Sequence, residues 1–124
     1  MKMVNGPTFA ILFALSACAG GSVPKPDEIA RLVDAGEVDR ARIAVQQAIK
    51  ADPGNRELAL LKGRIAIESG NPDLAISELS RLMADPAMAA RAREHLAHAH
   101  LMAGNARKAI ATLGDAAPVS ALGY

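Results

Sequence analysis

Apolar residues recur along most of this chain at intervals of three and four positions, the spacing that places side chains on one face of an α-helix. From about residue 27 onward, short stops containing Gly, Pro, Asn or Asp interrupt the pattern. Alanine is abundant and β-branched residues are not clustered, which favours helices over strands. The pattern predicts an all-α fold with helices over residues 27–35, 38–51, 56–69, 72–84, 87–103 and 105–113.

Three glycines mark the stops most clearly. Gly36, Gly70 and Gly104 follow one another at intervals of 34 residues, and each separates two helical segments. Because glycine adopts the left-handed conformation just past a helix end, each is predicted to lie between helices. At Asn71-Pro72 and Asp85-Pro86, a capping side chain precedes a proline that fits the first helical position. These dipeptides are predicted to begin the fourth and fifth helices.

The second helix of each pair carries an apolar stripe that repeats with the same period. Ala41, Ala75 and Ala109 lie five residues after the three glycines. A fixed period of this length is typical of stacked repeats, and a small side chain allows two helix backbones to approach closely. We therefore expect a buried stripe formed by Val38, Ala41, Val45, Ala48, Ile49, Leu74, Ala75, Leu79, Leu82, Ala106, Ala109, Ile110 and Leu113.

These positions resemble the tetratricopeptide repeat, a helix–turn–helix unit of 34 residues. The second half of that repeat is matched without a gap by Gly36, Ala41, Val45, Ala48 and Pro53, and Gly63 matches the glycine of the first helix. Lys62 departs from the pattern, because leucine is typical there. The resemblance covers about residues 27–113 and implies an α-solenoid of three repeats, stacked in a right-handed array, that binds proteins.

The amino-terminal residues predict export rather than part of the fold. Lys2 precedes an apolar run over residues 9–15, too short to span a bilayer, and small residues follow. Leu15-Ser16-Ala17-Cys18 resembles the bacterial lipobox, whose cysteine is acylated and becomes the first residue. Residues 1–17 are thus predicted to be a lipoprotein signal peptide. The alternative is an ordinary secretory signal in which this single cysteine occurs by chance.

Lipidation of Cys18 would anchor the mature protein to a membrane, since two or three acyl chains hold a protein stably. Ala19 follows the cysteine, where aspartate would signal retention at the inner membrane in the enterobacterial sorting rule. The resemblance therefore implies the periplasmic face of the outer membrane. Residues 18–26 are predicted to be the lipidated terminus and a short tether.

In the tetratricopeptide repeat, the first helix of each pair lines a concave face that binds partners. The resemblance implies that two stripes spaced 3, 4 and 3 residues apart share this face. Mixed charged and aliphatic side chains suit a protein or peptide partner, although they are equally consistent with an ordinary solvated helix face. The candidate partner-binding residues are Glu57, Leu60, Arg64, Ile67, Arg91, Glu94, His98 and Leu101.

No residue pattern indicates catalysis, a cofactor or a small-molecule substrate. His95, His98 and His100 lie in one predicted helix, but only two of them share a face, whereas a zinc site needs at least three convergent ligands. One packed and two solvated histidines, with no metal site, are the preferred interpretation. Without Lys2, the 14 basic residues become 13 and equal the 13 acidic ones, which gives no electrostatic case for nucleic acid.

The sequence thus predicts a non-catalytic, lipid-anchored adaptor that serves envelope machinery such as pilus, secretion or outer-membrane assembly. Two alternatives stay open: a permanently packed subunit of an envelope complex or homo-oligomer, and, more distantly, a metal-binding protein. Residues 114–124 break the helical pattern. This tail is expected either to cover the last helix through Leu122 or Tyr124, or to be frayed.

Overall fold

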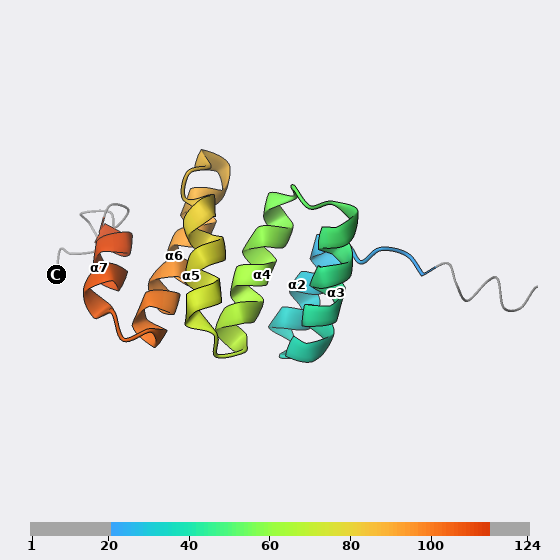
Figure 1. Cartoon of the computed structure of the whole chain (residues 1–124), viewed down its shortest axis with the longest axis horizontal. Coiled ribbons are helices and arrows are strands. Elements are labelled where there is room, and N and C mark those ends of the chain that lie inside the picture. Colours follow the sequence, from blue (N-terminus) through green and yellow to red (C-terminus); the bar gives the residue numbers. More distant parts are fainter. Residues whose placement is uncertain (1–20, 115–124) are drawn as a thin grey trace, which may run out of the picture.

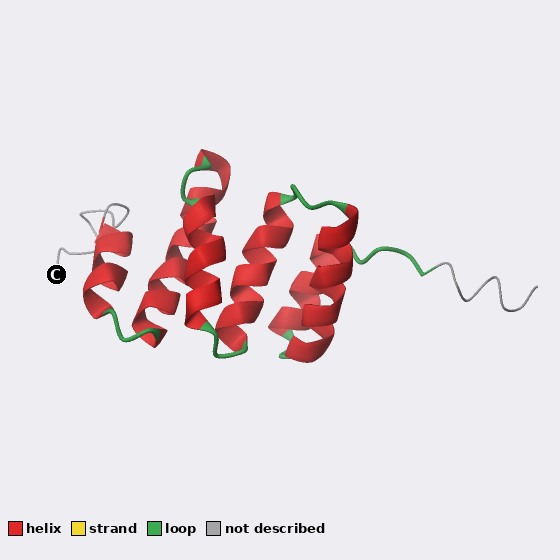
Figure 2. Cartoon of the chain, viewed as in Figure 1, coloured by secondary structure: helices red, strands yellow, loops and turns green. Residues whose placement is uncertain are grey.

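The computed structural model describes residues 21–114, and these residues form α-helices and no strand. Successive helices run up and down and form two layers along the long axis of the molecule, with α2 and α3 at one end and α7 at the other (Figures 1 and 2). The all-helical prediction is confirmed for this part of the chain, and every helix boundary lies within two residues of the expected one. The helices are α2 (Pro26–Asp34), α3 (Val38–Ala51), α4 (Arg56–Glu68), α5 (Pro72–Leu82), α6 (Pro86–Met102) and α7 (Ala106–Gly114).

Predictions that concern residues 1–20 and 115–124 fall outside the described residues. They include the signal peptide, acylation of Cys18 and the contact expected from Leu122 or Tyr124. Within residues 21–114, no helix has both the length and the apolar character needed to cross a membrane.

The turns within the three helix pairs share one geometry, which the sequence period encodes. Gly36, Gly70 and Gly104 have φ angles of 77°, 73° and 78°. At the middle turn, the Gly70 N–H donates to the carbonyl of Ile67 at 3.0 Å, and the Asn71 N–H donates to the carbonyl of Ala66 at 2.8 Å. The same two hydrogen bonds recur at the other two glycines. This pairing satisfies the last free carbonyls of a helix and requires the left-handed conformation that glycine accepts.

Capping side chains begin α5, which follows the Gly70 turn, and α6, which begins the next pair. The Asn71 side chain accepts from the Leu74 N–H at 3.3 Å, and the Asp85 carboxylate accepts from the Ala87 N–H at 3.0 Å. Pro72 and Pro86 occupy the first helical positions, where no intrahelical donor is required. Both predicted helix starts are therefore confirmed, and Asn71 ends one turn motif while it begins the next helix.

The core consists of two apolar clusters that meet at α4. One cluster joins α2, α3 and one side of α4 through residues such as Ile29, Val45 and Ile65. The other joins the opposite side of α4 to α5 and α6 through residues such as Leu79 and Leu96. Helix α4 is therefore the central element, in contact with helices on both sides.

Small residues bring α4 and α5 close together. Ala75 is fully buried, as are its repeat equivalents Ala41 and Ala109, so the prediction of buried alanines at this position is confirmed. Gly63 is also buried, and a Cβ atom built there would lie 2.7 Å from Cγ and Cδ2 of Leu79. This distance is far shorter than a normal carbon–carbon contact, so Gly63 is required for the close packing of the two helices.

The apolar stripe of the last helix differs from the prediction. Ala109 is buried, but Ile110 is 71% exposed, and Ala106 and Leu113 are exposed as well. In the middle repeat, Leu74 is also exposed. The expectation that these side chains are buried is wrong. Among the described helices only α6 packs against α7, which leaves one side of α7 uncovered, and Leu74 lies at the start of α5, which makes no close backbone contact with α3.

Candidate functional site

The layer formed by α2, α4 and α6 differs from the layer formed by α3, α5 and α7 in how closely its helices approach one another. Helices α2, α4 and α6, the first of each pair, contact one another in sequence. Within residues 21–114, by contrast, α3, α5 and α7 make no close backbone contacts with one another. One side is therefore a continuous face of three helices, and the other has spaces between its helices.

Two ion pairs join neighbouring helices of the continuous face. Nη2 of Arg64 lies 2.8 Å from Oδ1 of Asp34, which connects α4 to α2. The two terminal nitrogens of the Arg91 guanidinium, Nη1 and Nη2, donate to the two oxygens of the Glu57 carboxylate, with Nη2 3.0 Å from Oε2. This pair connects α6 to α4. The hydrogen bond to Glu57 raises the pKa of Arg91.

These pairs change the role expected of their members. Exposed ion pairs contribute about 0–1 kcal/mol each, although the two-pronged geometry of Arg91 and Glu57 orients both side chains. Three of the candidate residues, Glu57, Arg64 and Arg91, are thus paired within the protein. They link α2 to α4 and α4 to α6, and a partner would have to compete with these pairs to contact them.

Two other candidate residues are not on the accessible face. Leu60 is 3% exposed and Ile67 is 6% exposed, and both belong to the cluster that contains Leu79 and Leu96. They are buried because α4 is covered on both sides, so its apolar residues face neighbouring helices. The expectation that Leu60 and Ile67 contact a partner is therefore corrected. Both side chains pack in the core instead.

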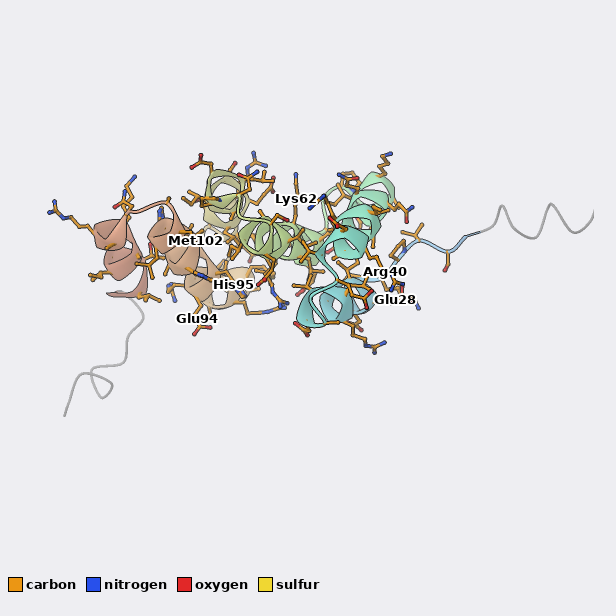
Figure 3. The ribbon with its side chains drawn as sticks, turned by 90° about the horizontal axis from the view of Figure 1, so that it is seen from below. Glu28, Arg40, Lys62, Glu94, His95 and Met102 are labelled. Atoms are coloured by element: carbon orange, nitrogen blue, oxygen red, sulfur yellow. The ribbon has the colours of Figure 1, made fainter. Side chains whose placement is uncertain are left out.

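The accessible part of the predicted surface is on α6. Glu94 and His98 are exposed, and Leu101 is 54% exposed. Their spacing of four and three residues places them on one side of the helix, and Figure 3 shows Glu94 projecting from it. This group offers a carboxylate, an imidazole and an aliphatic side chain.

The neighbouring histidines are more buried than expected. His95 and His100 are both half-buried, whereas the sequence predicted one packed histidine and two solvated ones. Burial lowers the pKa of His95, and the positive charge of Arg64 lowers it further. Burial, followed by the charge of Lys108, also lowers the pKa of His100. Across residues 21–114, no three His, Cys, Asp or Glu side chains are placed to hold a metal ion together.

The opposite side of the molecule has a groove that the sequence analysis missed. It has a volume of about 600 Å³ and lies between α3 and the start of α5, with α4 as its floor. Lys62 lies at this groove, between the ribbons of α3 and α5 and on the side away from Glu94 (Figure 3). One sequence feature could have indicated this groove: Lys62 stands where the repeat typically has leucine.

Comparison with known families gives one match. The tetratricopeptide repeat profile matches residues 32–93, which are 62 of the 124 residues. The chain belongs to the tetratricopeptide repeat family. Comparisons with curated proteins and with solved structures gave no match.

Membership of the tetratricopeptide repeat family indicates a module for protein–protein interaction. The matched region ends within α6, but Gly104 and Ala109 continue the 34-residue period beyond it. The turn at Gly104 has the same geometry as the turns of the matched region. The third helix pair is therefore a further repeat of the same kind.

Proposed function

We propose that this tetratricopeptide repeat protein is a lipid-anchored, non-catalytic adaptor of the bacterial envelope, on the periplasmic face of the outer membrane. The observation that carries the proposal is the lipobox-like Leu15-Ser16-Ala17-Cys18 just before an interaction module. Acylation explains why the only cysteine of the chain stands at this position, since a free thiol would be reactive in an oxidising compartment. The adaptor holds a partner of the pilus, secretion or outer-membrane assembly machinery near the membrane.

In this proposal the partner docks on α6 through Glu94, His98 and Leu101. These side chains are exposed, whereas Glu57, Arg64 and Arg91 already form ion pairs within the protein. A peptide or helix that presents a basic residue to Glu94 and an apolar side chain to Leu101 matches this chemistry. Helix α6 is held against α4 and α5 by buried residues such as Ala92 and Leu96, so little ordering of its backbone is required when the partner binds.

The test of the anchor is the Cys18→Ser variant, compared with the parent protein in membrane and soluble fractions of the native host. The variant is expected to leave the membrane fraction or to keep its signal peptide, because acylation precedes cleavage at a lipobox cysteine. A variant that fractionates and migrates as the parent does would refute lipid anchoring.

One observation favours the alternative of a permanently packed subunit. Four large apolar side chains of α6 and α7 are exposed: Leu101, Met102, Ile110 and Leu113. Where exposed apolar side chains form one contiguous patch, the patch is typical of a surface that binds other proteins. Light scattering of the purified protein over a range of concentrations tests this alternative. A mass twice that of the monomer that persists on dilution favours it, and a monomer at all concentrations contradicts homo-oligomerisation.

A further inference from the structure

The groove between α3 and α5 combines an apolar surface with positive charge. Its apolar part consists of Val45, Ile49, Ile65, Ala66 and Leu74, and its cations are Arg42, Lys50 and Lys62. No carboxylate lines it; the other lining residues are Gln46, Ser69 and Asn71. A volume of about 600 Å³ lies within the range of ligand sites, about 300–1,000 Å³.

An internal comparison explains why the groove exists. One repeat later, the position of Lys62 is taken by Leu96, which is buried in the core. The positions of Arg42 and Ile49 are taken by Ile76 and Met83, which pack against the same cluster. At two of these three positions the later repeat has apolar side chains that join the core, whereas the earlier one has the charged groups of Arg42 and Lys62. The groove is thus a property of specific residues in this chain.

The charges around the groove are only partly balanced. Nζ of Lys62 lies 3.0 Å from Oε1 of Glu78 on α5, and Nη2 of Arg42 lies 3.2 Å from Oδ1 of Asp39. Among the described residues, Lys50 has no carboxylate within ion-pair distance. The entrance therefore presents a net positive charge next to an apolar surface, which attracts a group that is both anionic and apolar.

We propose that this groove binds an acidic amphipathic segment of a partner protein, at a site separate from the α6 face. Aliphatic side chains of the segment contact Ile49 and Leu74, which are the more accessible apolar residues of the groove, and its carboxylates pair with Lys50 and Arg42. A protein segment fits better than an enclosed small ligand, because the groove lies open between two helices that do not touch. Laying an amphipathic helix into such a groove is a common mode of peptide recognition.

This site does not depend on the lipid anchor or on the α6 surface. A solenoid that binds one segment on each side can hold two proteins together, which extends the adaptor function proposed above. If the groove does not bind the peptide, the membrane fractionation of Cys18→Ser and the contacts of α6 are unaffected. The groove site and the lipid-anchored adaptor can therefore be refuted independently.

The test measures binding of a fluorescent designed helical peptide to the full-length protein in the form in which it is purified from its native host, with the peptide alone as the blank. The peptide carries leucines on one face and glutamates beside them, and a second peptide has lysine in place of each glutamate. Fluorescence anisotropy is expected to show saturable binding of the acidic peptide, weakened by salt, and no binding of the basic one. Equal binding of both peptides, or of neither, would overturn the proposal.

Variants locate the site. Arg42→Glu with Lys50→Glu is expected to weaken binding about tenfold, because two attractive pairs become repulsive. Arg107→Glu with Lys108→Glu is the matched control, since it makes the same charge change at exposed positions of α7 and should bind as the parent does. A second variant, Lys62→Leu with Glu78→Ala, fills the groove as the later repeat does and should also reduce binding. Unchanged binding by both groove variants, with helical content retained, would exclude this site.

Discussion

Gly63→Ala probes the packing that holds the central repeat together. The new Cβ would lie 2.7 Å from Cγ and Cδ2 of Leu79, and because Leu79 is fully buried, it can move away only by displacing other core residues. Overpacking of this kind costs about 1–3 kcal/mol. Replacing a glycine by alanine within a helix otherwise stabilises the fold by about 0.5–1 kcal/mol. The expected net effect is a loss of up to about 2.5 kcal/mol, and each kcal/mol lowers Tm by about 4–8 °C in a domain of this size.

Thermal unfolding followed by circular dichroism measures this loss, and a double-mutant cycle assigns it to one contact. With Leu79→Ala, the obstructing atoms are absent, so Gly63→Ala is expected to be neutral or to stabilise by about 0.5–1 kcal/mol. Sucrose can be added to all samples if Leu79→Ala alone is too unstable to measure. Gly54→Ala is the control, because nothing lies within 4 Å of the Cβ built there. An equal loss in both backgrounds would refute the reasoning.

Three further predictions concern the turns, the core and the histidines. Gly70→Ala should lose about 1–2 kcal/mol in urea unfolding because φ is 73° there, whereas Gly70→Asn should lose less; equal losses would contradict this. Ala75→Leu should lose about 1–3 kcal/mol, since Ala75 is fully buried; unchanged stability would show that the helices can separate. Because the pKa values of His95 and His100 are lowered from 6.5, the unfolded chain binds more protons just below pH 6.5. Stability should therefore fall as the pH decreases through this range, and His95→Gln should reduce the dependence; an unaltered pH profile would argue against it.

The helices could be predicted from sequence because their ends are encoded locally. A left-handed glycine or an Asn-Pro pair ends or begins a helix through its own backbone and side-chain chemistry, as at Gly70 and Asn71. The 34-residue period then indicated that the turns would be alike, and their hydrogen bonds are alike. Boundaries and repeat number therefore required no knowledge of the tertiary contacts.

The surface could not be predicted as well, because exposure depends on which helices cover each face. Leu60 and Ile67 have helical spacing that suits an open face, yet α4 is covered on both sides and buries them. Ile110 has the spacing of a buried residue but no described helix beyond α7 to cover it. The Glu57–Arg91 pair spans 34 residues, so it exists only because successive repeats stack in phase.

The most direct test of the proposed adaptor is photocrosslinking in living cells, with a photoreactive residue placed at position 98 or 101 of the full-length protein. Position 47 on α3, which is exposed and outside the groove, is the control. The account predicts a discrete protein adduct from positions 98 and 101 that is absent from position 47 and is reduced by Cys18→Ser. The same adducts from all three positions, or none from positions 98 and 101, would contradict it.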